Sequence, residues 1–313
     1  MLLLMAMALA ISCEQCHAKE TESFAKTPMA HALRKGSGEI PEANFKDGLY
    51  SIAIRKESGQ NVYSATDGER HIEAPVLWEF GNGQMGRTFL YRLGSDYYES
   101  TVSWYSAIHG LDLTPGHRDR PRRNLDEAAG RKVDPAELRR CFGCHSTGME
   151  SPQPGVQCLH CHAGAAEHES TLLNRKTATP MPKLSRSSSE EISQLCGKCH
   201  RTWEDIAANG PHSVLNVRFQ PYRLAESKCY DAVDRRIACT ACHDPHNETR
   251  RDGAFYDSKC QACHNQAERG VRTCSVAKAN CVSCHMPKIE IPGLHFEFSD
   301  HKIRIARAGE PYR

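Results

Sequence analysis

The chain has 313 residues, with 40 lysines and arginines against 38 acidic residues, and its mean hydropathy is −0.58. Apolar residues make up 39%, which is lean for this length, because a core of that size normally relies on aliphatic side chains. The richest basic stretch, Arg118 to Arg123, is interrupted by Asp119 and Pro121, and we interpret it as a solvated face. We therefore expect no nucleic-acid partner. No stretch of about 20 apolar residues occurs in the sequence, so we expect no transmembrane span.

The N-terminal residues Met1 to Ser12 are uncharged and mostly apolar, and Ala8-Leu9-Ala10 resembles a leader-peptidase site. We predict a signal peptide over residues 1–12. The basic stretch that usually opens such a peptide is missing, which suggests a true start further upstream. Ile11-Ser12-Cys13 also resembles a lipoprotein box, an alternative that competes with the role of Cys13 described next.

The dominant feature of the sequence is the pentapeptide Cys-x-x-Cys-His, which occurs seven times and uses 14 of the 16 cysteines. The copies are motif 1 (Cys13, Cys16, His17), motif 2 (Cys141, Cys144, His145), motif 3 (Cys158, Cys161, His162), motif 4 (Cys196, Cys199, His200), motif 5 (Cys239, Cys242, His243), motif 6 (Cys260, Cys263, His264) and motif 7 (Cys281, Cys284, His285).

Cys-x-x-Cys-His is the attachment motif of c-type haem. The two thiols bond to the macrocycle as thioethers, and the histidine binds the iron from the proximal side. Structural zinc and redox dithiols are the alternatives, but neither requires a histidine after every second cysteine. We predict seven covalently attached haems c, one for each motif. Such attachment happens outside the cytoplasmic membrane, so we expect a periplasmic or extracellular protein.

No motif lies between motif 1 and motif 2, and this region has a different pattern. Leu49 to Ile54, Thr88 to Tyr91 and Tyr98 to Trp104 alternate between apolar and polar residues, as strands do, with glycine-rich turns between them. We predict a segment with motif 1 over residues 13–35, followed by a β-rich insertion over residues 36–140.

Residues 141–313 then form a predicted six-haem domain. Short helical stretches over Asp134 to Arg140 and Ser189 to Leu195 each lead into a motif, and Asp134-Pro135 is a favourable helix start. We predict a fold that is mainly α with little regular structure, organised around packed haems, with a small antiparallel β insertion between motif 1 and motif 2. Because macrocycles would supply much of the core, we expect the haem-free chain not to fold on its own.

Ten further histidines could supply a second iron ligand, and two imidazoles on one iron close it to substrates and favour electron transfer. We interpret His71 and His109 as surface or hydrogen-bonded residues. His160 lies within motif 3, where its geometry disfavours binding to another iron. The predicted distal ligands are His31, His117, His168, His212, His246, His295 and His301.

The two cysteines outside the motifs are Cys229 and Cys274. Both precede an attachment motif in a chain that we expect in an oxidising compartment, and we predict a disulfide between them. Two buried free thiols are the alternative.

Motifs 2 and 3, followed by His168, resemble the doubled CxxCH segment of a superfamily. Its members include tetrahaem cytochromes of ammonia oxidation, octahaem hydroxylamine oxidoreductase and pentahaem nitrite reductase. Cys239 to His246 and Cys281 to Lys288 resemble multihaem cytochromes of the same kind, and the likeness covers roughly Cys141 to His301. It carries over no catalytic residue. Every motif ends in histidine where nitrite reductases have a lysine at the catalytic haem, and no tyrosine can be placed as the cross-linked residue of hydroxylamine oxidoreductases.

We predict an electron carrier rather than an enzyme. It would relay electrons between periplasmic or extracellular partners, either redox proteins or quinol-linked donors. One alternative is a multihaem reductase of a small nitrogen or sulfur oxyanion with one open haem site. Another is a subunit of a conductive cytochrome polymer, an oligomer formed through haem stacking.

Overall fold

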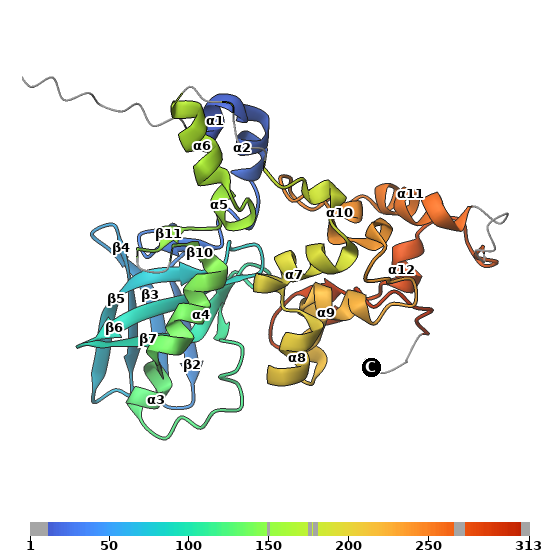
Figure 1. Ribbon diagram of the computed structural model, residues 1–313. Coiled ribbons are helices and arrows are strands. Elements are labelled where there is room, and N and C mark those ends of the chain that lie inside the picture. Colours follow the sequence, from blue (N-terminus) through green and yellow to red (C-terminus); the bar gives the residue numbers. More distant parts are fainter. Residues whose placement is uncertain (1–11, 149–150, 175–176, 178–180, 266–272, 308–313) are drawn as a thin grey trace, which may run out of the picture.

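The structure is a computed structural model that describes residues 12–148, 151–174, 177, 181–265 and 273–307. All of the predicted signal peptide except Ser12 lies outside these residues. An antiparallel sheet occupies one side of the molecule, and short helices occupy the other (Figure 1). The strands are β1 (Leu33–Lys35), β2 (Ala43–Asp47), β3 (Tyr50–Glu57), β4 (Gln60–Thr66), β5 (His71–Phe80), β6 (Gly86–Leu93), β7 (Asp96–Tyr105), β8 (Gly110–Leu113), β9 (Gly130–Val133), β10 (Ser146–Thr147), β11 (Gln153–Pro154), β12 (Lys288–Glu290) and β13 (Glu297–Ser299).

The helices are mostly short, and several consist of little more than a motif. They are α1 (Cys13–Cys16), α2 (Ala18–Phe24), α3 (Leu125–Ala129), α4 (Pro135–His145), α5 (Cys158–Cys161), α6 (Ala165–Leu173), α7 (Ser189–His200), α8 (Trp203–Asn209), α9 (Gln220–Ala225), α10 (Cys239–Cys242), α11 (Gly253–His264) and α12 (Cys281–His285), with 3-10 turns η1 (Leu184–Arg186), η2 (Val214–Arg218) and η3 (Arg235–Ile237).

The predicted fold class is wrong, because the chain is 34% helix and 25% strand and contains a nine-stranded antiparallel sheet. The region between motif 1 and motif 2 is antiparallel, as expected, but it is not small. Alternation revealed β3, β6 and β7 and missed the neighbouring strands. In β4, Asn61 and Ser64 are buried together with the apolar residues, so the strand shows no simple alternation. The domain boundaries at residues 35 and 140 stay predictions.

The sheet is a meander in the order β2 to β8, with β1 added beside β5 and β9 beside β7. The end strands β2 and β8 contact each other, so the sheet nearly closes on itself. Register shifts between Val76 and Trp78 and between Thr88 and Leu90 interrupt the pairing of β5 with β6 and of β6 with β7. Such bulges increase local twist, which helps a sheet to curve.

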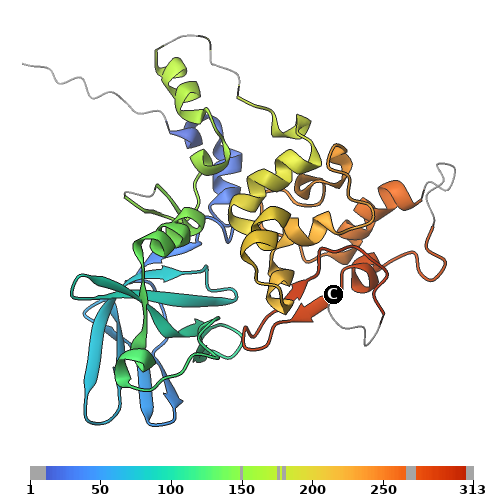
Figure 2. The same cartoon turned by 60° about the horizontal axis from the view of Figure 1, so that its bottom comes forward.

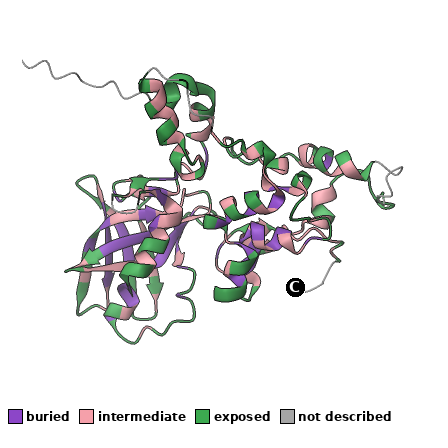
Figure 3. Ribbon diagram, in the orientation of Figure 1, coloured by how far each residue is buried: buried purple, intermediate pink, exposed green. Residues whose placement is uncertain are grey.

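Protein side chains alone form the core enclosed by this sheet. Ile52, Tyr63, Val76 and Phe89 are among its buried members, and α3 adds Leu125 at one end. A much smaller apolar cluster joins Tyr105 of β7 to Val217, Ile291 and Leu294. Burial is accordingly concentrated in the sheet (Figure 3). The two parts of the molecule therefore differ in how far their own side chains can stabilise them.

Most motif helices lie outside the sheet. Helices α1, α2, α5 and α6 form one group, and α7 to α12 form another, an arrangement that also holds in the turned view (Figure 1, Figure 2). Helix α4 packs against the sheet through Phe142, which contacts the cluster around Leu33 and Leu90. No helix in the described part of the chain is long and apolar enough to cross a membrane.

The two predicted helical stretches that lead into motifs are confirmed. Asp134 caps α4, because its carboxylate accepts the backbone N–H groups of Ala136 and Glu137, each at 2.8 Å. Helix α7 begins with a capping box between Ser188 and Glu191. Both helices continue through their motif to its histidine, so ordinary helix-start signals determine where motifs 2 and 4 lie.

Candidate haem-binding sites

Each motif in the structure forms a turn of α-helix or lies at the C-terminal end of a longer helix. In the short motifs the histidine N–H closes the turn on the carbonyl of the first cysteine, at 2.8 Å for His17 and 2.9 Å for His162 and His243. Residues i, i+3 and i+4 of a helix share one face. Both thiols and the imidazole of a motif are therefore presented on the same side, as attachment to one macrocycle requires.

All 14 motif thiols are free and at least partly exposed. Thiols of different motifs also lie close enough to influence each other's pKa, which reveals how the motifs neighbour one another. Neighbouring pairs are Cys13 with Cys158, Cys161 with Cys196, Cys144 with Cys199, Cys196 with Cys239, Cys242 with Cys260, and Cys260 with Cys281. The motifs thus follow the spatial order 1, 3, 4, 5, 6 and 7, and motif 2 joins at motif 4.

Several proximal histidines have an oxygen acceptor at Nδ1. His145 donates to the carbonyl of Ala32 and His285 to the carbonyl of Arg304, both at 2.9 Å. In His200, Nδ1 lies 3.0 Å from Oε1 of Gln220. A ring that donates from Nδ1 keeps its lone pair on Nε2, and metal-binding histidines are commonly oriented in this way.

His162 of motif 3 faces the predicted distal ligand His246. Their Nε2 atoms are 3.5 Å apart, their ring centroids are 5.7 Å apart, and the ring planes differ by 4°. The distance between the centroids exceeds the distance between the Nε2 atoms by about two imidazole ring radii. The two Nε2 atoms therefore lie on the line between the rings and point at each other. Two metal–imidazole bonds of about 2 Å each would need a slightly larger separation along the same line. Both Nε2 atoms could therefore bind one metal ion placed between the two rings.

A second imidazole pair joins motif 5 to the C-terminal region. The rings of His243 and His301 have centroids 6.2 Å apart with planes tilted by 41°. The Nδ1 of His301 donates to the carbonyl of Ser299 at 3.0 Å, which again leaves Nε2 with the lone pair. His301 is thus oriented like the proximal histidines, although it lies outside every motif.

Burial favours the neutral form of these rings. It is the largest cause that lowers the pKa values of His145, His162, His200 and His243, and it lowers the pKa of His301 to about 4. A neutral imidazole is the form that binds a metal, because protonation removes the lone pair.

Two predicted distal ligands are engaged elsewhere. Nε2 of His117 lies 3.0 Å from Oε2 of Glu99, and Nε2 of His295 lies 2.8 Å from Oδ2 of Asp112. His117 is 3% exposed, and both carboxylates belong to the sheet. Sequence reasoning missed these partners. The structure does not bring either histidine to a motif imidazole.

The remaining histidine predictions are placed as follows. His31 and His212 are exposed, and His168 is half-buried on α6. His160 has its Nε2 4.0 Å from Sγ of Cys199 in motif 4, so it lies near a neighbouring motif even though we expected no role for it there. As predicted, His71 is an exposed strand residue, and its Nε2 lies 3.1 Å from Glu73. The roles of the distal candidates stay predictions.

The predicted disulfide does not form in the structure, where Cys229 and Cys274 are both free and exposed. Cys229 lies instead near the thiols of Cys260 and Cys263 in motif 6. Two cysteines that are left over after the motifs are assigned, and that each precede a motif, need not be neighbours in the fold, so the prediction of this disulfide is wrong.

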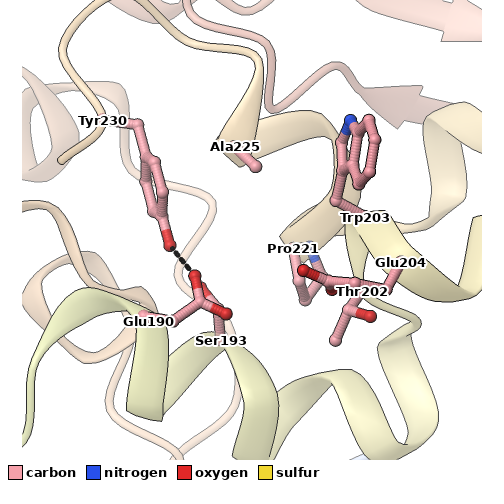
Figure 4. Close-up of a pocket in the computed structure, with 8 residues that line it drawn as sticks. All are labelled: Glu190, Ser193, Thr202, Trp203, Glu204, Pro221, Ala225 and Tyr230. Atoms are coloured by element: carbon pink, nitrogen blue, oxygen red, sulfur yellow. Dashed lines mark hydrogen bonds between the residues drawn. The ribbon is translucent and has the colours of Figure 1, made fainter. Parts of the chain in front are cut away.

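A small pocket lies beside motif 4, between α7, the start of α8, and α9. Its volume is about 270 Å³, and the hydroxyl of Tyr230 donates to Glu190 at 2.9 Å at its edge (Figure 4). Trp203 and Glu204 form the opposite side, and no predicted ligand is among its lining residues. The pocket is therefore separate from the candidate haem sites.

Two acidic residues that sequence reasoning missed support motif 7. Asp257 on α11 accepts the backbone N–H groups of Asn280 and Cys281, at 2.7 and 2.8 Å, and so caps the motif helix α12 from a neighbouring helix. Asp300 lies in the C-terminal segment that contacts His285. Asp300 directly precedes the predicted ligand His301, and this adjacency is a weak signal in the sequence. No sequence feature indicated a role for Asp257.

No family model, curated protein or solved structure matches this chain. The resemblance to the multihaem superfamily therefore stays a prediction from the motifs. Within the described ranges, no group of three or more histidine, cysteine, aspartate or glutamate side chains could hold a metal ion. The residues do fit a covalent haem, because two accessible thiols and an imidazole share one helix face in the motifs.

Proposed function

We propose that the chain is a seven-haem c-type cytochrome that relays electrons between redox partners in the periplasm or outside the cell. The observation that carries this proposal is the facing pair His162 and His246, 3.5 Å apart at Nε2. Haem c, when bound, supplies reversible one-electron transfer at its iron. The motif cysteines would attach it, the motif histidines would hold the iron, and His246 would close the second axial position at motif 3.

The spatial order of the motifs supports a relay rather than isolated sites. Thiols that influence each other's pKa connect motif 1 through motifs 3, 4, 5 and 6 to motif 7, with motif 2 as a branch at motif 4. Axial histidine pairs also lack the methionine that raises the potential of small cytochromes c, so we expect mostly low potentials.

Intact mass tests the cofactor content. We expect the denatured protein to exceed the polypeptide mass by seven haems, and a Cys13→Ala, Cys16→Ala variant to exceed it by six. The matched control is Cys229→Ala with Cys274→Ala, which should keep all seven, because neither cysteine belongs to a motif. A wild-type protein without covalent haem would overturn the proposal.

Ligand binding tests the relay against catalysis. The reduced protein should not bind carbon monoxide and should not turn over nitrite or hydroxylamine, because irons with two imidazoles are closed. A reductase of a small nitrogen or sulfur oxyanion is the second candidate, since His117 and His295 are engaged by carboxylates and the supply of distal imidazoles is smaller than the sequence suggests. Stoichiometric carbon monoxide binding at one iron, with turnover of either substrate, would favour the reductase.

A further inference from the structure

A buried ion pair joins α9 to the C-terminal segment. The guanidinium of Arg223 binds Asp300 through two hydrogen bonds, from Nε to Oδ1 at 2.9 Å and from Nη2 to Oδ2 at 3.0 Å. Arg223 is 1% exposed and Asp300 is 0% exposed. This bidentate geometry fixes the orientation of both groups, and arginine provides it where lysine cannot.

Further contacts complete a cluster, here called the C-terminal clamp, formed by Arg223, Glu226, Asp300 and Arg304. Arg304 donates from Nη1 to Oδ2 of Asp300, and Arg223 donates from Nη1 to Glu226 at 2.6 Å. Lys302 adds a further cation, with Nζ 3.6 Å from Oε2 of Glu226, so both carboxylates of the clamp face positive charge. The chain is thereby held on both sides of residue 301.

The segment held by the clamp contacts the imidazoles of two motifs. His301 directly follows Asp300, and its ring faces His243 of motif 5. The backbone of Arg304 forms two hydrogen bonds with His285 of motif 7: its carbonyl accepts from Nδ1 at 2.9 Å, and its N–H donates to the His285 carbonyl at 3.2 Å. The clamp therefore holds a segment that carries His301 and contacts His285, and both histidines are candidate ligands.

Ser227, two residues beyond the end of α9, fixes the backbone around His301. Its hydroxyl donates to the carbonyl of His301 at 3.0 Å and accepts the N–H of Ile303 at 2.8 Å. With the bond from His301 Nδ1 to Ser299, the imidazole is restrained on its ring and on its backbone. Such restraints on ligand orientation are typical of metal-binding histidines.

We propose that the C-terminal clamp is a positioning device that holds His301 as the distal ligand at motif 5 and orients His285 at motif 7. The inference rests on the proposed haem ligation. Stability alone gives no reason for the clamp, because apolar residues of similar volume often replace a buried ion pair without loss of stability. A directional pair, by contrast, holds one backbone segment in one orientation.

The test separates positioning from folding. In the holoprotein, Arg223→Met with Asp300→Leu replaces the pair by apolar side chains. We expect it to keep seven covalent haems and a cooperative thermal transition, but to show a high-spin electron paramagnetic resonance signal from one iron in seven and to bind one equivalent of carbon monoxide when reduced. A fully low-spin spectrum without carbon monoxide binding would overturn the proposal.

Further variants identify the affected iron. His301→Ala should give the same high-spin signal, and combining it with the clamp variant should add no second high-spin iron. Arg223→Lys retains the charge but not the bidentate geometry, so its high-spin fraction should be intermediate. The matched control is Arg55→Gln with Glu73→Gln, an exposed pair in the sheet 2.7 Å apart, which should leave every iron low-spin.

If the apolar double variant does not fold, Asp300→Asn provides the test, because the amide keeps the shape and loses the charge. A low-spin spectrum identical to the wild type would then overturn the clamp. Failure of the proposed function has a different signature, because the wild-type protein itself would lack seven haems or show open irons. If the wild type and the clamp variants are all closed and low-spin, the clamp proposal is wrong while the proposed function still stands.

Discussion

An oxygen acceptor at Nδ1 is the local feature that distinguishes an oriented imidazole from an ordinary polar side chain. His145, His285 and His301 each donate from this nitrogen to a backbone carbonyl. In His117 and His295 the contact to a carboxylate is instead made by Nε2, the nitrogen that would bind iron. Whether the contact uses Nδ1 or Nε2 therefore distinguishes histidines that could bind iron from those that are otherwise engaged. The mere presence of a histidine in the sequence does not.

The facing pair at motif 3 leads to a prediction for a single residue. His246→Ala should open one iron in seven and produce one high-spin signal while leaving all covalent haems in place, because the attachment residues are unchanged. Absorption and electron paramagnetic resonance spectra of the ferric protein measure this. His160→Ala is the matched control and should stay low-spin; a high-spin signal in that variant would contradict our ranking of the two histidines.

The sheet core allows a prediction of stability. Ile52 is 1% exposed within the apolar cluster, so Ile52→Ala should lower the free energy of unfolding by about 2–5 kcal/mol through lost burial and an unfilled cavity. Denaturant titration followed by near-ultraviolet circular dichroism measures the change. Ser51→Ala, at the exposed neighbouring position, is the control and should have little effect.

Helices are the scale at which sequence and structure agree most closely. The cap at Asp134, the proline after it and the capping box at Ser188 are local signals, and both helices begin where these residues predict. The carboxylate of Asp257, by contrast, caps α12 from another helix, 23 and 24 residues before the groups it binds. Local patterns contain no information about such a partner.

The cap of α4 also predicts a pH dependence. The N–H of Glu137 is the main cause that lowers the pKa of Asp134, and the N–H of Ala136 adds to it. A depressed folded-state pKa stabilises the fold above the unfolded value near 3.9, and this stabilisation is lost as the pH falls through the folded value. Asp134→Ala should therefore lower the thermal midpoint at pH 7, and the difference from wild type should shrink as the pH falls through the folded-state pKa.

Asp134→Asn separates the hydrogen bond from the charge. Asparagine also caps helices, so this variant should retain most of the stability at pH 7, and its midpoint should not respond to the titration of residue 134. Equal losses in the alanine and asparagine variants at pH 7 would show that the charge, rather than the hydrogen bond, stabilises this helix start.

For the whole molecule, the sequence pointed to haem as the organising element, and this emphasis produced the wrong fold class. The motifs predicted attachment positions but not the nine-stranded sheet, and buried Asn61 and Ser64 removed the alternation that would have revealed β4. The partners of His117, 18 residues away, and of His295, 183 residues away, depend on tertiary contacts that spacing cannot reveal.

Because the large apolar core lies in the sheet, we predict that the sheet folds without cofactor and that the helical part does not. In chain produced without haem attachment, amides of β3, β4, β6 and β7 should be protected from hydrogen exchange, because these strands contribute buried side chains to one large apolar cluster. Amides of α10, α11 and α12 should exchange rapidly, since Asp257 is the one buried residue in these three helices and no apolar side chain of theirs is buried. Uniform protection, or uniform exchange, would contradict this division and is readily detected by mass spectrometry.

The facing imidazoles His162 and His246 also have a consequence for maturation. They are 84 residues apart, so if the chain is exported from its N-terminus, as the proposed function requires, His162 would enter the new compartment well before its partner. The iron at motif 3 would then have one imidazole and one open position until the later segment arrives. In the same way, motif 5 would wait for His301 near the end of the chain. The order of synthesis thus delays closure of these sites, and an interrupted chain would expose reactive irons that the finished protein conceals.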